Sequence, residues 1–545
     1  MNRFFGRKWL PRFFLLAYMF LAVGLTGCGE RTLDVNMRLI TKGCHSSDAL
    51  DGVGFLRITV SGDGLEQPMP TTATVGSGEA VLLDIPLGGS GETVRRRIDI
   101  EGTAHPPSAD DPPPVMARGT AVVDMPRDST SMTINVFLRP VDRFGLTGSA
   151  EQPDLCTEMG VARFGHTSTV LRDGRVLIVG GAQSNGDGDR TVLSSAELFN
   201  PSTGEFSPIS ADHGPAVPRA FHTATLLRDG RVLIAGGEFD SADHNYPQAH
   251  MSAEIYDPAE GRFVDAFPAP RTRARHTATR VSGDVVLLIG GYESLEPGAD
   301  GYPVPTSSMD IFVGETTSFV SAAEGAPVLP VPRAEHCAVA NQSEDLVLIA
   351  GGITVNGEGD VAVSQTFSFL RTWRDEQLNQ RFEFVNSDAE GMAPRYALAC
   401  GVVREAGGVE RAVMAGGFGD LDESSPYARV ESVTLELAES AQASSIDGTM
   451  SGGSMGNVCA SDFEGSVLLT GGRHGDGTAV ELADRLSYSQ ERTALQSVRG
   501  RMSEPRFDHS CVTLLNGSVL VTGGRQGQAG AGSLSAAEIY MPIGR

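Results

Sequence analysis

The stretch Arg163–Gly181, RFGHTSTVLRDGRVLIVGG, returns almost unchanged as Arg219–Gly237, RAFHTATLLRDGRVLIAGG. In each copy, two apolar runs flank an Asp-Gly pair. This is a strong hairpin signal, because both central residues of the favoured two-residue turn have positive φ. A glycine pair then ends the second run, at a point where backbones crowd and a Cβ would not fit. The stretch therefore predicts a repeated unit that begins with a β-hairpin.

The glycine pair extends the repeat to the end of the chain. A third apolar strand follows it, as in Ala196–Pro201, and a fourth is expected at Glu205–Ile209. Successive pairs are 52 to 65 residues apart, a period that indicates stacked four-stranded sheets rather than separate domains. The pairs begin at Gly180, Gly236, Gly290, Gly351, Gly416, Gly471 and Gly523.

On these motifs, residues 160–545 resemble a bacterial kelch-repeat β-propeller. The resemblance implies one blade per glycine pair, hence seven blades, with six or eight as alternatives. The repeated histidine is replaced by Leu398 and Asn457 in the fifth and sixth copies, which are degenerate. The last copy stops after its third strand, so we expect Phe144–Gly148 to supply the fourth and close the ring. The propeller domain is thus predicted over 141–545.

Residues 32–140 predict a smaller β domain. Short runs with a period of two, such as Leu33–Ile40 and Phe55–Val60, are separated by turn-forming residues, and no helical period is present. The pattern favours an antiparallel β-sandwich, and it resembles the immunoglobulin-like or prealbumin-like spacer domains of bacterial surface lipoproteins. The proline-rich stretch 104–114 reads as a loop. We expect this domain to hold the propeller away from a membrane.

The first 27 residues predict a secretion signal. A cationic start is followed by an apolar run over 13–25, which is too short for a membrane-spanning helix. Leu25–Cys28 resembles the lipobox of bacterial lipoproteins, which implies a diacylated Cys28 and residues 28–31 as its linker. By the same resemblance, Gly29 favours the outer membrane or cell surface. The alternative is an ordinary cleaved signal with an incidental cysteine.

The net charge of the chain excludes one class of binding partner. The net charge is −25 and the only lysines are Lys8 and Lys42. Binding to a phosphate backbone needs a basic surface, so a nucleic-acid partner is excluded. An acidic exterior of this kind is typical of a solvated surface protein.

The side chains that recur in the repeat have two interpretations. A ring of equivalent histidines could hold a metal ion, but its interruption by Leu398 and Asn457 favours a structural hydrogen bond repeated with the unit. The recurring arginines and glutamates are explained in the same way, and no metal or catalytic residue is predicted. The recurring residues are His166, His222, His276, His336, His509, Arg163, Arg219, Arg273, Arg333, Arg395, Arg506, Glu197, Glu254 and Glu538.

Six cysteines remain after Cys28. Cys44 and Cys156 lie outside the repeat register, one in each predicted domain, and a disulfide between them is a hypothesis that an exported chain permits. Cys400, Cys459 and Cys511 are placed two residues after the histidine position, where other copies carry Ser or Ala. That pattern favours free, packed thiols.

The loops after the glycine pairs are the predicted binding surface. Several are acidic, and Asn185–Asp189 has the alternation of a calcium loop but lacks the later glycine and glutamate, so calcium is only a weak candidate cofactor. The candidate ligand-binding residues are Asp187, Asp189, Asp240, Asp243, Asp420 and Asp422.

Two functions remain open from the sequence. The first is a monomeric, membrane-anchored binding module for a protein or glycan. The second is an exported kelch-type, carbohydrate-active enzyme, by analogy with copper radical oxidases or sialic-acid mutarotases. The oxidases need a Tyr, Tyr, His, His set that no pattern here matches, and the mutarotases need converging Arg and Glu side chains.

Overall fold

The computed structural model describes residues 32–543, apart from residues 43, 45–47, 75–79, 89–90, 107–112, 185–189, 321–326, 378, 390, 437–440, 490–491 and 528–531. The predicted signal, Cys28, Asp187 and Asp189 lie outside these described residues. Within them the chain consists of strands and one short 3-10 turn at Ala406–Gly408, which confirms the all-β prediction. No helix in this part of the chain has the length and apolar character to cross a membrane.

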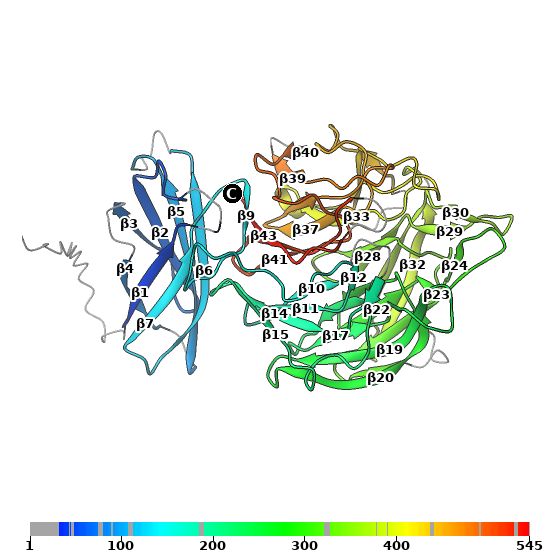
Figure 1. Cartoon of the computed structure of the whole chain (residues 1–545), viewed down its shortest axis with the longest axis horizontal. Coiled ribbons are helices and arrows are strands. Elements are labelled where there is room, and N and C mark those ends of the chain that lie inside the picture. The colour runs from blue at the N-terminus through cyan, green and yellow to red at the C-terminus, as the bar shows by residue number, and fades with distance from the viewer. Residues whose placement is uncertain are drawn as a thin grey trace, which may run out of the picture.

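The N-terminal region consists of two sheets around one core (Figure 1). Apolar residues alternate inward from both sheets, including Val35, Ile58 and Ile98, and all three are fully buried. One sheet has the order β4 (Ala80–Pro86), β1 (Thr32–Ile40), β7 (Ser131–Phe137). The other has the order β3 (Met69–Thr74), β2 (Phe55–Gly62), β5 (Thr93–Thr103), β6 (Ala117–Pro126), β8 (Arg139–Pro140).

One pairing in this region differs from the purely antiparallel prediction. β1 and β7 run parallel, with Asp34 opposite Ser131. A parallel pair needs a long crossover connection. Strands β2, β3, β5 and β6 of the second sheet lie between β1 and β7 in sequence, together with β4, and provide that crossover, which local strand patterns do not reveal.

The rest of the chain forms seven main antiparallel sheets, six with four strands and the second with a short fifth strand, which we number as repeats 1 to 7 in chain order. Their first strands are β10 (Thr167–Val170), β16 (Thr223–Leu226), β21 (Thr277–Val281), β27 (Cys337–Ala340), β33 (Ala399–Arg404), β37 (Cys459–Phe463) and β41 (Ser510–Thr513). Their second strands are β11 (Val176–Val179), β17 (Val232–Ala235), β22 (Val285–Ile289), β28 (Leu346–Ala350), β34 (Glu410–Ala415), β38 (Ser466–Thr470) and β42 (Val519–Thr522).

The outer strands complete each sheet. The third strands are β14 (Ala196–Asn200), β19 (Gln248–Asp257), β25 (Met309–Val313), β31 (Phe367–Arg374), β35 (Val430–Thr434), β39 (Ala483–Ser489) and β43 (Ala537–Met541). The fourth strands are β15 (Glu205–Pro208), β20 (Arg262–Arg273), β26 (Ser318–Phe319), β32 (Gln380–Ala389), β36 (Ser444–Ser445), β40 (Arg492–Ser497) and β9 (Arg143–Leu146). Short additional strands extend the loops: β12 (Ala182–Ser184), β13 (Arg190–Val192), β18 (Glu238–Phe239), β23 (Tyr292–Pro297), β24 (Pro303–Pro305), β29 (Ile353–Val355) and β30 (Val361–Val363).

The repeats form a circle. The first strand of each sheet contacts the first strand of the next, and β41 contacts β10. β9 lies before repeat 1 in sequence and pairs with β43 of repeat 7, with Phe144 opposite Tyr540. This strand lies where the sequence analysis expects the closing strand, and it covers an edge of repeat 7 that would otherwise be open.

The glycine pairs are the joints between neighbouring repeats. Gly180 and Gly181 have φ of 60° and 91°, values that side chains rarely adopt. A Cβ on Gly180 would lie 2.3 Å from the carbonyl oxygen of Arg219 in the next repeat, and one on Gly181 would lie 2.7 Å from that of Phe164. Only glycine therefore fits at both positions.

The N-terminal region packs against the hairpin ends of the first and last repeats (Figure 1). Arg95 and Arg97 donate hydrogen bonds to backbone carbonyls at Arg172 and Leu515, over 3.3 and 3.5 Å. A disulfide joins Cys44 to Cys156, with their Cα atoms 4.9 Å apart. The two hydrogen bonds, the single chain connection between β8 and β9, and the disulfide therefore fix the region to this face of the circle.

Candidate functional site

The residue just before the repeated histidine has an unusual backbone in every repeat. We call this the axial position, and its φ is between 49° and 61° throughout, in the left-handed region that few non-glycine residues adopt. Backbone hydrogen bonds run from one axial position to the next, for example from Phe221 N–H to the Gly165 carbonyl over 2.8 Å. Six such bonds join neighbouring axial positions in series, from Asp508 through Gly165 and around to Asn457. The axial residues are Gly165, Phe221, Arg275, Glu335, Ala397, Asn457 and Asp508.

A second position per repeat lies beside the first. The residue after each glycine pair, which we call the rim position, forms an isolated β-bridge with the residue before the axial one. The rim residues are Ala182, Glu238, Tyr292, Ile353, Phe418, Arg473 and Arg525. Because the backbone is the same in all repeats, only the side chains at these two positions differ.

These side chains converge on a cavity of about 380 Å³, which we call the axial cavity. Four axial and five rim residues line it, together with loop residues from several repeats. Its charged and phenolic lining consists of Arg190, Glu238, Arg275, Tyr292, Tyr302, Glu335, Tyr396, Glu423, Arg473, Asp508 and Arg525. A concave site with a few converging polar groups is the usual form of a small-ligand site.

Arg275 is at the centre of one charged group. Its guanidinium lies 3.3 Å from the carboxylate of Glu238 and 3.5 Å from that of Glu335, and it stacks over Phe221 at 4.2 Å. Burial alone would lower the pKa of Arg275, but the neighbouring carboxylates outweigh burial and raise it. Burial raises the pKa of Glu335, although Arg275 opposes this. Arg275 is therefore a fixed cation, and the raised pKa of Glu335 makes its carboxyl group easier to protonate than an exposed glutamate.

Two further arginines are held between aromatic rings. The guanidinium of Arg525 lies 4.3 Å from the Phe164 ring and 4.7 Å from the Phe507 ring, and that of Arg473 lies 4.8 Å from the Phe418 ring. Arg525 also pairs with Asp508, and Arg473 with Glu423. Each guanidinium is thus oriented before any ligand arrives.

Tyrosine hydroxyls complete the lining. Burial raises the pKa of both Tyr292 and Tyr396, with help from nearby carboxylates. Both phenols therefore remain protonated near neutral pH and can donate hydrogen bonds. The cavity offers guanidinium and phenol donors beside carboxylate acceptors, a set suited to a polar, hydroxyl-rich ligand.

The cavity opens on the face opposite the N-terminal region. Each first strand runs from the axial position to a hairpin turn, such as Asp173-Gly174, and the second strand returns to the glycine pair. The N-terminal region contacts the turn end at Arg172 and Leu515, whereas the axial and rim positions lie at the other end. One face of the circle therefore contacts the N-terminal region, and the opposite face carries the axial cavity.

The predicted aspartates are not part of this lining. Asp240 lies 3.7 Å from Arg190, while the backbone N–H of Asp243 donates a hydrogen bond to Ser241 Oγ. Asp420 accepts hydrogen bonds from Ser424 and Ser425 within its own turn. Among the described residues, no three His, Cys, Asp or Glu side chains are placed to hold one metal ion.

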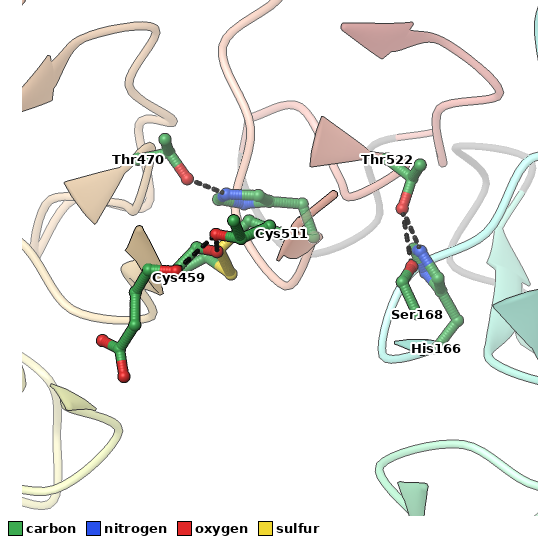
Figure 2. The surroundings of a disulfide bond; sticks show 10 residues. His166, Ser168, Cys459, Thr470, Cys511 and Thr522 are labelled. Atoms are coloured by element: carbon green, nitrogen blue, oxygen red, sulfur yellow. Dashed lines mark hydrogen bonds between the residues drawn. A yellow bond between two sulfur atoms is a disulfide. The ribbon is translucent and has the colours of Figure 1, made fainter. Parts of the chain in front are cut away.

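The repeated histidines have a structural hydrogen bond. His222 Nε2 lies 2.9 Å from Thr167 Oγ1 of the preceding repeat, and His276 and His336 have the same arrangement. In the remaining two cases the threonine is on the second strand: Thr522 contacts His166 and Thr470 contacts His509 (Figure 2). Burial lowers the pKa of all five, to about 3 for His336 and His509.

The repeated arginines are also structural. Arg163 forms a buried ion pair with Glu197 at 2.6 Å within its own sheet, and Arg219, Arg273, Arg395 and Arg506 have equivalent partners. Repeat 4 has Ser368 at the acidic position, and repeat 6 has Met455 at the arginine position, opposite Asp484. The arginines thus hold the third strand to the loop that leads into the first.

The free-thiol prediction is wrong. Disulfides join Cys337 to Cys400 and Cys459 to Cys511, between the first strands of neighbouring repeats. Figure 2 shows the second of these bonds, Cys459–Cys511. The register also needs correction, because Val458, not Asn457, packs against the preceding glycine pair as the histidines do. Each bond therefore joins the first residue after the histidine position to the second residue after it in the next repeat. Those two positions lie next to each other where the first strands of neighbouring repeats meet. The sequence of a single repeat does not show this contact.

Sequence reasoning missed the axial cavity. The available signal was variation inside conserved surroundings, since Phe221, Arg275 and Glu335 occupy one position of an otherwise repeated motif. Searching for residues that recur selects those that hold the fold. The residues that could hold a ligand are the ones that change between copies.

Comparison with known proteins adds a partial relationship. No family model matches the chain. A putative adagio-like protein 2 of Oryza sativa subsp. japonica is 24% identical over 207 residues, which are 35% of this chain and 30% of that protein. An F-box/kelch-repeat protein of Arabidopsis thaliana is 27% identical over 153 residues, 26% of this chain and 30% of that protein. A galactose oxidase of Gibberella zeae is 28% identical over 119 residues, 22% of this chain and 17% of that protein.

The chain thus spans less than a third of the length of each of these relatives. Among solved structures, one titled "Structure of YjhT" aligns with a TM-score of 0.44 and 13% identity, over 62% of this chain and 99% of that one. The kelch-type sequence relatives agree with the circle of four-stranded sheets described above. The chain therefore carries kelch-type repeats folded as a β-propeller.

Proposed function

We propose that this protein is a lipid-anchored protein of the cell envelope whose seven-bladed propeller binds a ligand in the axial cavity. The ligand is a glycan or a polar segment of a protein, and the N-terminal region is a β-sandwich spacer. The observation that carries the proposal is the placement of variable charged side chains on an invariant backbone circle. The protein acts as a monomer and does not bind nucleic acid, in keeping with a net charge of −25.

The anchor and the cavity fit this role together. Lipidation at Cys28 would tether the N-terminal region, which packs on the turn face of the propeller. The cavity opens on the opposite face and would then point away from the outer membrane, toward its ligand. Two acyl chains are needed for firm attachment, since one binds only marginally.

The anchor is tested by Cys28→Ala. The native chain should partition into the detergent phase of a Triton X-114 separation and carry the mass of attached acyl chains. The variant should be in the aqueous phase without that mass. An unmodified Cys28 in the native protein, with the signal removed, would contradict the proposed anchoring.

The cavity is tested with two isosteric variants. The full chain, Glu335→Gln and Tyr292→Phe are screened against a glycan array and against envelope extract, with Glu358→Gln, an exposed loop change, as the matched control. We expect a ligand of the native chain and of Glu358→Gln whose binding is about tenfold weaker in both cavity variants. A ligand bound equally by all four proteins would locate binding elsewhere.

The second candidate is a mutarotase-like, carbohydrate-active enzyme. Its support is the convergence of Arg275, Glu335 and Tyr292, because a carboxyl group with a raised pKa beside a phenol can exchange a proton with a sugar hydroxyl. Exchange NMR on reducing sugars, comparing the native chain with Glu335→Gln, tests it. An oxidase is less well supported, since the described cavity lining contains tyrosines but no histidine.

A further inference from the structure

A second cavity, of about 220 Å³, lies where the N-terminal region meets the propeller. Lys42, Arg139 and Arg143 line it, and no acidic residue is among its described lining. Its other lining residues are Thr41 and mostly apolar residues, which include Phe137 and Phe144. We call it the basic pocket. It is on the opposite side of the propeller from the axial cavity.

The three cations of the basic pocket lie at the ends of strands where the two regions meet. Lys42 follows β1, Arg139 begins β8 and Arg143 begins β9. The nearest acid in sequence, Asp142, is turned away: its carboxylate accepts hydrogen bonds from the Tyr540 hydroxyl at 3.0 Å and from the Arg499 N–H at 3.3 Å. The linker therefore places positive charge in the pocket and directs its one negative charge into the propeller.

The positive charge is not neutralised within the described part of the protein. Arg139 donates to the Leu146 carbonyl at 3.2 Å and lies 5.7 Å from the Phe137 ring, with no carboxylate in ion-pair range. Burial lowers the pKa of Arg139 to about 10, and no neighbouring acid opposes the shift. Lys42 and Arg143 likewise form no ion pair with a described residue. The chain has 68 acidic and 43 basic residues, so three cations without an acid depart from its general pattern.

We infer that the basic pocket binds the phosphate group of a phosphomonoester. A dianion neutralises two of the three cations, whereas a carboxylate neutralises only one and would leave two of them without a counter-charge. The planar guanidinium of Arg139 can donate to two oxygens at once, and Lys42 and Arg143 can reach the rest from the exposed side. The apolar wall at Phe137 and Phe144 fits the organic part of the ester.

The pocket is also preorganised. β8 pairs with β6 of the N-terminal region and β9 pairs with β43 of the propeller, so Arg139 and Arg143 are fixed to different regions across a short turn. The Cys44–Cys156 disulfide holds the two regions at this spacing. A ligand therefore pays little ordering entropy on binding.

The test is titration calorimetry on the full chain purified in detergent, at constant ionic strength. Glycerol 3-phosphate is the probe and glycerol is its neutral control. We expect one site per chain, with binding weakened about tenfold or more in Lys42→Gln/Arg143→Gln, whose changed side chains are exposed. Arg262→Gln/Arg381→Gln removes two exposed arginines elsewhere and should leave binding unchanged.

Arg139→Gln should weaken binding as well, and circular dichroism checks that it folds. Inorganic phosphate and dihexanoyl phosphatidic acid distinguish the source: equal binding of inorganic phosphate assigns a free-phosphate site, and tighter binding of the lipid assigns a headgroup site. No binding by the native chain, or equal binding by Lys42→Gln/Arg143→Gln, would overturn the inference. The result is independent of the axial cavity, which contains none of these residues.

Discussion

At the scale of single residues, the repeated histidines illustrate how a buried polar group is satisfied in more than one way. In repeats 1 to 3 the hydroxyl comes from the residue after the histidine, as in Thr167. In repeats 6 and 7 it comes from the second strand, from the residue that pairs with the first residue after the histidine position. Thr470 pairs with Cys459 in this way, and Thr522 pairs with Ser510. The hydrogen bond is kept while the residue that provides it changes strand.

These histidines make stability depend on pH. Their pKa is lowered in the folded protein, so the unfolded chain binds protons that the folded chain does not. The free energy of unfolding is therefore highest above pH 6.5. It decreases as the pH falls toward 3, by about 1.4 kcal/mol per histidine per pH unit. His336→Leu, which copies Leu398, should reduce the slope of melting temperature against pH between 6.5 and 4.

The control for this measurement is His213→Leu, at an exposed histidine, which should leave the slope unchanged. At neutral pH, His336→Leu leaves Thr277 without its partner and should cost about 1 kcal/mol. An unchanged slope in His336→Leu would show that the folded histidine takes up protons as readily as the unfolded one.

At the scale of elements, the sequence predicted the strands that flank repeated motifs. It did not predict the contacts between neighbouring repeats. The Asp-Gly turns and glycine pairs located the hairpins, because each has one physical cause within its own unit. Asn457 was misplaced because repeat 6 lacks both the arginine and the histidine that fix the register. The disulfides were missed because their geometry depends on two neighbouring sheets.

The two disulfides inside the propeller close loops of 63 and 52 residues between neighbouring first strands. By the chain-entropy relation each stabilises the fold by about 4 kcal/mol. We expect no alkylation of these four cysteines without reductant, measured by peptide mass spectrometry. Cys459→Thr/Cys511→Ser copies the residues of repeat 1 and should lower the melting temperature without loss of the fold.

A matched comparison is Cys337→Thr/Cys400→Ser, at the equivalent junction of repeats 4 and 5. Both double variants should fall by similar amounts, because the loops have similar lengths. Alkylation of Cys459 and Cys511 in the native, unreduced protein would contradict the paired state.

At the scale of the whole molecule, the circle depends on a strand from outside the repeats. β9 is the segment that the incomplete last repeat led us to expect, since a three-stranded sheet has an open edge. The axial cavity could not be foreseen in the same way. It is formed by side chains from several repeats, and no single stretch of sequence contains it.

Two truncations test the role of β9. A chain of residues 141–545 keeps β9, and a chain of residues 150–545 lacks it; both carry Cys156→Ser and both lack the N-terminal region. We expect the longer chain to unfold in one sharp transition, and the shorter one to melt earlier and aggregate through the edge of β43. Equal melting and solubility, measured by calorimetry and light scattering, would mean that β9 does not seal the circle.

The position of the Cys44–Cys156 disulfide has a mechanical consequence. Cys44 precedes β9 in sequence and Cys156 follows it. A pull applied at the N-terminal end therefore passes through the sulfur–sulfur bond directly into the propeller and leaves residues 45–155 outside the load path. β9 therefore carries no tension. A force applied at the N-terminal end cannot separate it from β43 while the disulfide is intact.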